Sequence, residues 1–153
     1  MIEEILKNKT IKDFKISENS LCTLHFSDGF CLSTKALVRF VGNNNDTFIC
    51  SNDHGHQFGL NQSINFEEDL KKIIQNCCIE DIKINSQTGD VGLFLKAGVI
   101  EIISTSKGYE SYQLNGPDNL TIVGYVGKQK PNSWQIRISV SAAKTLIPGS
   151  SKQ

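Results

Sequence analysis

Apolar and polar residues recur along the chain in two spacings, and these predict two short helices among many strands. Apolar positions within 2–6 follow the i, i+3, i+4 spacing of an amphipathic helix, and the same spacing returns over 66–77. Asn65 stands before the second run with Glu68 three residues later, which predicts a capped start for that helix.

Alternation of apolar and polar residues predicts the strands. They lie at about 11–16, 22–26, 30–32, 79–84, 91–95, 99–103, 109–114, 120–126 and 134–140. Asp28-Gly29 predicts a tight hairpin, Trp134 is expected to point inward, and residues 43–65 are expected to be the least regular. Because strands outnumber helices and follow one another as hairpins, we expect an α+β domain with a mostly antiparallel β-sheet.

The order of these elements occurs twice, which indicates a degenerate internal repeat. Residues 11–16 read IKDFKI and residues 79–84 read IEDIKI, at an offset of 68 residues. The alignment joins about 2–31 with 70–100, inside units of about 2–41 and 66–105. Past the repeat we expect C-terminal strands over about 109–140 and a flexible tail at 142–153, all within a single domain, 1–153.

The composition is typical of one globular domain. The 153 residues are 39% hydrophobic and 21% charged. No apolar run approaches the roughly 20 residues of a membrane helix, and the start of the chain does not read as a signal peptide, so we expect a cytoplasmic protein. Five cysteines, two of them adjacent and none in a CxxC pattern, are expected to stay reduced.

Charge is unevenly distributed, although 16 basic and 16 acidic residues balance. Residues 46–118 hold 11 acids and 5 bases, a net charge of −6, whereas five bases and no acid follow Asp118. The acidic middle would steer a basic partner towards the protein. Alternatively, the acidic and basic regions neutralise each other on an ordinary solvated surface.

Candidate chemistry is sparse. Cys50, Asp53, His54 and His56 offer zinc ligands within seven residues, but their spacing matches no closed structural pattern, so we expect no metal and no cofactor. No nucleophile elbow, dinucleotide-binding glycine pattern or P-loop occurs, and the sequence therefore predicts a protein that is not an enzyme.

A resemblance to a known family enters through residues 79–124. They read IEDIKI, then TGDVGLFL, then YESYQLNGP, then LTIV. This order resembles small bacterial proteins in which a G-[DE]-L-x-L-x-F strand is followed by a Y-E-S-[WY]-x-[IL] strand ending in Gly-Pro. They look like immunity proteins of contact-dependent growth inhibition and other polymorphic toxin systems. The chain departs from the pattern at its second hairpin, where Ala97-Gly98 stands in place of Asp-Gly.

The resemblance implies an inhibitor that binds a cognate toxin domain, often a basic nuclease, and covers its active site or substrate channel. Four of the acidic residues of the middle region, with two tyrosines as aromatic anchors, are the expected partner-binding residues. They are Asp90, Glu101, Tyr109, Glu110, Tyr112 and Asp118.

Two alternatives remain open at this point. The first is a small nucleic-acid-binding module that uses the basic C-terminal region, with Tyr125 and Trp134 available for stacking on bases. The second is a metal- or ligand-binding β domain that uses the cysteine, aspartate and histidines of residues 50–56.

Overall fold

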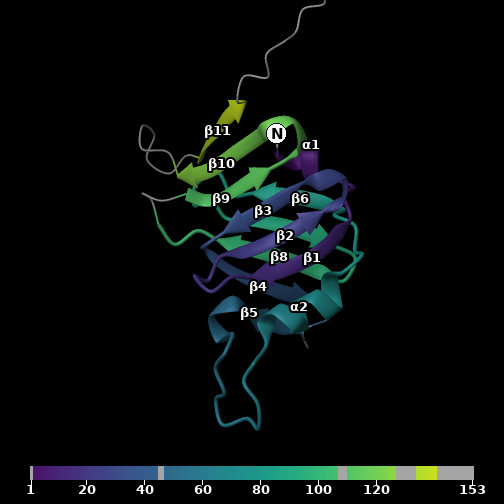
Figure 1. Ribbon diagram of the computed structural model, residues 1–153, viewed down its shortest axis with the longest axis vertical. Helices are drawn as coiled ribbons and strands as arrows, with labels where there is room; N and C mark the ends of the chain where they lie inside the picture. The colour runs from purple at the N-terminus through teal and green to yellow at the C-terminus, as the bar shows by residue number, and fades with distance from the viewer. Residues whose placement is uncertain (1, 45–46, 107–109, 127–133, 141–153) are drawn as a thin grey trace, which may run out of the picture.

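The computed structural model describes residues 2–44, 47–106, 110–126 and 134–140, and the side chains of all these except 125, 126 and 134–140. Two helices and eleven strands follow one another in this part of the chain (Figure 1). Their bounds are α1 (Ile2–Leu6), β1 (Ile11–Ile16), β2 (Cys22–Phe26), β3 (Cys31–Thr34), β4 (Leu37–Gly42), β5 (Phe48–Cys50), α2 (Phe66–Ile74), β6 (Asp81–Ile84), β7 (Val91–Leu95), β8 (Gly98–Ile103), β9 (Glu110–Asn115), β10 (Leu120–Val126) and β11 (Trp134–Val140).

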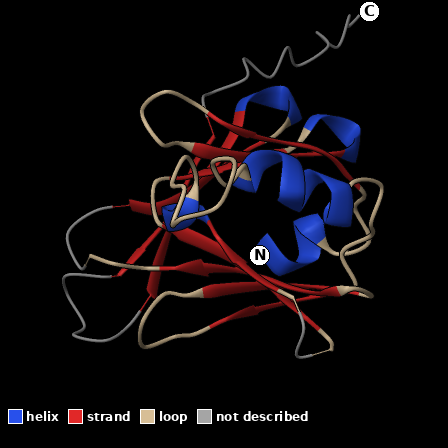
Figure 2. Ribbon diagram, turned by 90° about the horizontal axis from the view of Figure 1, so that it is seen from below, coloured by secondary structure: helices blue, strands red, loops and turns tan. Residues whose placement is uncertain are grey.

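The strands form two antiparallel sheets, so the α+β class with mostly antiparallel pairing is confirmed. One sheet has the order β1-β2-β3-β9-β10-β11 and the other β5-β4-β8-β7-β6. Figure 2 shows strands both above and below the longest helix. The tail at 142–153 and the side chain of Trp134 lie outside the described residues.

The two halves of the chain exchange strands between the sheets. β1, β2 and β3 form a meander, but the chain then crosses over, and β4 pairs with β8 of the other sheet. In the second half β6, β7 and β8 form a meander, and β9 crosses back to pair with β3. Each sheet is therefore completed by strands from the other half of the chain.

The junction between the halves has matching hydrogen bonds. The nitrogen of Asn8 donates to the oxygen of Ile79 at 2.8 Å, and the nitrogen of Asn76 donates to the oxygen of Ile11 at 2.8 Å. These two bonds are related by the offset of 68 residues seen in the sequence. Such an arrangement is what a duplicated unit would produce, and the duplication itself stays a prediction.

The expected helix cap and hairpin are both present. Asn65 caps α2 by accepting a hydrogen bond from the nitrogen of Glu68 at 3.1 Å. Asp28 and Gly29 both have positive φ, of 64° and 79°, as a tight turn between β2 and β3 requires. The helix was expected to reach residue 77 but ends at Ile74, because Asn76 turns the backbone to φ 64°.

Both helices bury their apolar faces in one core between the sheets. The buried residues of α1 are Ile2 and Leu6, and those of α2 are Phe66, Leu70 and Ile74. Phe66 meets Phe14 of β1 edge to face, with ring centroids 5.6 Å apart. The helices are too short to be stable alone, so this packing holds them in place.

Candidate functional site

Of the six partner-binding residues expected from the sequence, the five that the structure describes do not form one continuous surface. Asp90 accepts a hydrogen bond from the nitrogen of Ser104 at 2.7 Å. Glu101, on β8, forms an ion pair with Arg39 of the neighbouring strand β4. Both carboxylates are therefore engaged within the fold, while Tyr109 lies outside the described residues.

Tyr112 is not an aromatic anchor, and this expectation is corrected by its burial. Its side chain is 1% exposed, and its ring lies against Gly124 on the adjacent strand β10. Burial raises the pKa of the phenol above its ordinary value of 10, and the charge of Glu3 adds to the shift. The sequence correctly placed Tyr112 and Leu114 on one face of β9, but that face points into the core.

Glu110 and Asp118 are exposed but separate. Glu110 begins β9, whereas Asp118 lies in the turn that follows the other end of that strand. Two exposed carboxylates at opposite ends of one strand do not make a continuous site.

A groove lies where the chain crosses between the sheets. Its volume is about 930 Å³, and hydroxyl side chains and Glu110 line it. Ser104 and Ser111 place their Oγ atoms 2.8 Å apart, and the hydroxyl of Thr34 donates to the carbonyl oxygen of Ser111. Because Asp90 also holds Ser104 in place, these polar groups satisfy one another and fix the crossing segments.

The most prominent surface feature is the segment between β5 and α2, residues 54–64, which we name the projecting loop (Figure 1). Gly55 donates to the carbonyl oxygen of Ile64 at 2.8 Å, and Ile64 donates to that of His56 at 2.7 Å. Nearer the tip, the nitrogen of Leu60 donates to the oxygen of Gln57 at 2.8 Å. The loop is therefore a hydrogen-bonded turn structure rather than an irregular connection.

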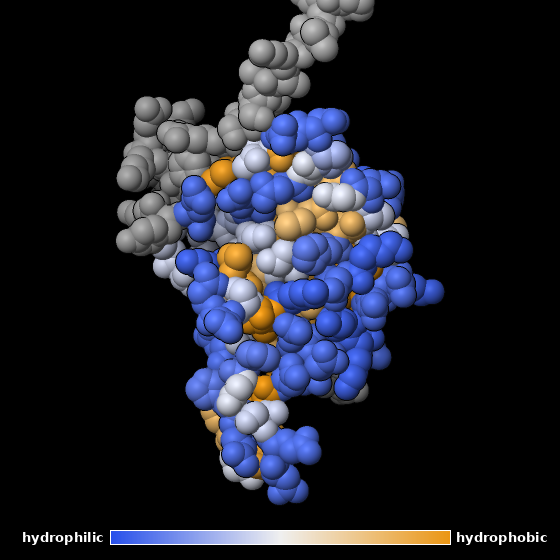
Figure 3. All heavy atoms as spheres, viewed as in Figure 1, coloured by the Kyte–Doolittle hydropathy of each residue, from blue (hydrophilic) through white to orange (hydrophobic). Residues whose placement is uncertain are grey.

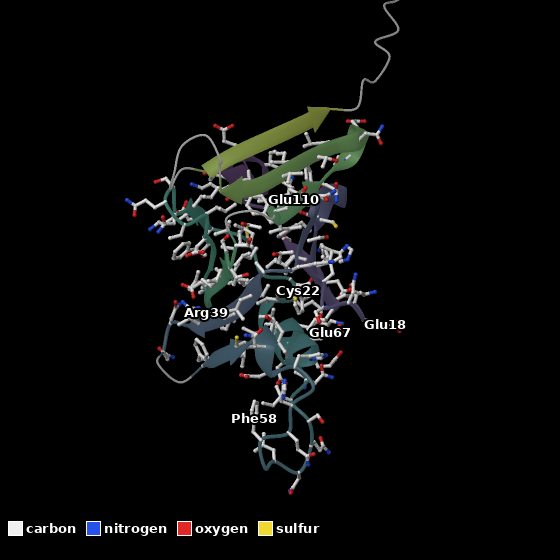
Figure 4. All side chains as sticks on the ribbon, turned by 90° about the vertical axis from the view of Figure 1, so that its left-hand side faces the viewer. Glu18, Cys22, Arg39, Phe58, Glu67 and Glu110 are labelled. Atoms are coloured by element: carbon white, nitrogen blue, oxygen red, sulfur yellow. The ribbon has the colours of Figure 1, made fainter. Side chains whose placement is uncertain are left out.

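Large apolar side chains lie open on this loop and on the strand before it. Phe58 is 68% exposed, Phe48 59% and Leu60 54%. Figure 4 shows Phe58 on the projecting loop and Glu110 towards the opposite end of the molecule. The loop extends from a mostly hydrophilic face (Figure 3). Large apolar side chains exposed on a projection, as Phe58 and Leu60 are here, are typical of protein-binding sites.

The charge around the loop is negative. Residues 47–70 contain four acids, Asp53, Glu67, Glu68 and Asp69, and no lysine or arginine. The last three occupy the first turn of α2, where the helix dipole stabilises carboxylates. Glu68 and Asp69 are exposed beside the base of the loop; Glu68 lies 3.8 Å from the amine of Lys71, and Asp69 forms no ion pair among the described residues.

The two histidines considered as metal ligands have structural roles in the loop. Nδ1 of His54 accepts a hydrogen bond from the nitrogen of Phe66 at 3.1 Å, so it helps to cap α2. The ring of His56 stacks on Phe58 with centroids 5.3 Å apart. In the part of the chain that the structure describes, no group of three His, Cys, Asp or Glu residues is arranged to hold a metal ion.

Reasoning from the sequence missed this loop because the segment has no regular spacing of apolar residues. A usable signal was present: Phe58 and Leu60 stand among small polar residues without the periodic apolar neighbours that would bury them. For the nucleic-acid alternative, the C-terminal basic side chains lie outside the described residues.

Among the described helices, none is long and apolar enough to cross a membrane. A comparison of the chain with family models, with curated proteins and with solved structures gives no match.

Proposed function

We propose that this chain is an immunity protein, which binds a cognate toxin domain and neutralises it by covering the active site or substrate channel. The resemblance of residues 79–124 to immunity proteins leads to this class, with a nuclease of a contact-dependent growth inhibition system as the toxin. The proposal places the protein in the cytoplasm.

The exposed apolar side chains on and beside the projecting loop carry the proposal. Fully burying one phenylalanine side chain contributes about 1.5–3 kcal/mol, and Phe58 and Phe48 both have most of that gain still available. Such aromatic residues dominate the energy of protein interfaces when a partner covers them. On an isolated protein they only add apolar surface.

The surrounding carboxylates fit the same role. Asp53 lies just before the projecting loop, and Glu68 and Asp69 lie in the first turn of α2 just after it, so carboxylates stand at both ends of the loop that carries the apolar residues. A basic partner would be attracted to this region before contact, and its association would be faster at low salt.

Growth in a laboratory host tests the proposal directly. The protein encoded by the reading frame immediately upstream, or its C-terminal domain, is expressed with and without this chain. We expect the upstream product to stop growth alone, and co-expression to restore growth and yield a complex that survives physiological salt during purification. A harmless neighbour, or toxicity that persists despite soluble co-expression, would show that the proposal is wrong.

A further inference from the structure

Resting on the proposed function, we propose that the projecting loop is a preformed plug. With Phe58 on one of its arms, it enters a basic, concave surface of the toxin domain and fills an apolar pocket there (Figure 4). The proposal moves the centre of the interface from the residues of β8 and β9 to residues 54–64.

The loop is held in shape before any partner arrives. Two backbone hydrogen bonds join its two arms: the nitrogen of Gly55 donates to the oxygen of Ile64 at 2.8 Å, and the nitrogen of Ile64 donates to the oxygen of His56 at 2.7 Å. At one end Nδ1 of His54 fastens it to the first turn of α2. A loop already ordered loses little conformational entropy on binding, so more of its contact energy appears as affinity.

The backbone at Phe58 points to a role for its side chain. Phe58 has φ 43° and is followed by Gly59 with φ 76°. The other non-glycine residues with positive φ in the described part of the chain are all Asn, Asp or Ser, which tolerate this conformation. A glycine at position 58 would relieve the strain, and the ring of Phe58, although stacked on one face by His56, is still 68% exposed. We infer that its ring serves a contact outside the chain.

The charge around the loop specifies the chemistry of the partner. Residues 47–70 carry four acids and no base, while Lys71 and Lys72 follow directly in α2, so a surface that surrounds the loop would be complementary if it supplied positive charge. The nearest described cation on the adjacent strand, Arg39, is paired with Glu101 and lies 5.9 Å from the ring centroid of Phe48. Its charge is thus neutralised within the protein. Lys71 of α2 pairs with Asp13, Glu67 and Glu68, at 3.3, 3.9 and 3.8 Å, so Asp53 and Asp69 are the carboxylates beside the loop that form no ion pair among the described residues.

Binding measurements with the purified upstream toxin domain test the plug. Phe58→Ala and Phe58→Gly are each expected to weaken binding by at least about thirty-fold, as hot-spot residues do. The glycine variant is also expected to unfold at the same temperature as the wild type or higher, because it removes the strain at φ 43°. Phe94→Ala is the control, because it removes a phenylalanine ring away from the loop. Phe94 is half-buried on β7, three strands from β5 in the same sheet, and its ring lies under the amine of Lys83. The Phe94→Ala variant should bind like the wild type.

Neutralising the carboxylates at the ends of the loop tests the charge of the partner. A triple variant with Asp53→Asn, Glu68→Gln and Asp69→Asn should associate about ten-fold more slowly at low salt, with the difference disappearing at high salt. Asp118→Asn, at an exposed carboxylate in the turn after β9, is its control and should leave the association rate unchanged.

The outcomes separate this inference from the proposed function. If the wild type neither rescues growth nor binds the toxin domain, the immunity function and the plug are both wrong. If the wild type rescues and binds, but the Phe58 variants do so equally well, only the plug is wrong. Hydrogen exchange of amides 55–64, compared between the free protein and the complex, tests the plug without any variant. Slower exchange in the complex supports the plug, and unchanged exchange overturns it.

Discussion

Gly124 is expected to be essential for the packing of the larger sheet, because it lies directly opposite Tyr112 across the pairing of β9 with β10. The ring of Tyr112 covers the glycine. An added Cβ at position 124 would lie 2.3 Å from Cε1 and Cζ of this ring and 2.8 Å from Cδ1. Ordinary carbon contacts are about 3.5–4.0 Å long, so Gly124→Ala must displace the ring by more than about 1 Å.

The ring cannot move freely, because Tyr112 is 1% exposed and packs within the core. Overpacking of this kind destabilises by about 1–3 kcal/mol. Replacing glycine by alanine also lowers the conformational entropy of the unfolded chain, which stabilises the folded state by about 0.4–1 kcal/mol. The net loss in the free energy of unfolding should therefore be about 1–2 kcal/mol, and the melting temperature should fall by about 2–8 °C.

A double-mutant cycle with Tyr112→Leu isolates the contact. Urea unfolding monitored by circular dichroism is measured for the wild type, both single variants and the double variant. In the Tyr112→Leu background the alanine at position 124 should cost nothing, because the ring it meets is gone, and the coupling should be about 1–3 kcal/mol. Equal destabilisation by Gly124→Ala in both backgrounds would refute the reasoning.

Three further predictions concern stability. Asn65→Ala removes the cap of α2 and should lower the free energy of unfolding by about 1 kcal/mol in urea titrations, whereas no change would exclude the cap as a stabilising contact. Glu67→Ala leaves the nitrogen of Ile16 without its 2.7 Å acceptor and should cost about 1–3 kcal/mol by the same assay; a smaller effect would mean that water replaces the carboxylate. Burial, with a contribution from the charge of Glu67, raises the pKa of Cys22 from 9.0 to about 11, so the unfolded chain loses this proton first. Stability should then fall by about 1.4 kcal/mol per pH unit between about pH 9 and 11, and Cys22→Ala should reduce this slope if the thiol causes it.

Local features of the fold could be predicted because short segments of sequence determine them. The Asp28-Gly29 turn and the Asn65 cap each follow from two or three neighbouring residues. The exchange of β4 and β9 between the sheets could not be predicted, because pairing of β3 with β9 joins residues about 80 positions apart. Alternation shows which residues share a face, but it is equally consistent with pairing to any other strand.

The candidate site was harder to predict for the same reason. The alternation in β9 placed Tyr112 and Leu114 together correctly, yet it does not say which face of a strand a second sheet will cover. From the sequence, Glu101 was interpreted as an unpaired acid on the surface, because its partner Arg39 is 62 residues away in the chain. The projecting loop depends on turns and backbone hydrogen bonds, which leave no periodic pattern to detect.

The exchange of strands between the two halves also constrains how the protein is made. β3 ends at residue 34 and gains its second neighbour only when β9, at 110–115, has been synthesised. At 5–20 residues per second the first meander waits roughly 4–16 s with that edge unpaired. The same holds for β4, which must wait for β8. During translation the N-terminal half therefore exposes open strand edges that would pair with other nascent chains, and chaperones that cover such edges should raise the yield of folded protein.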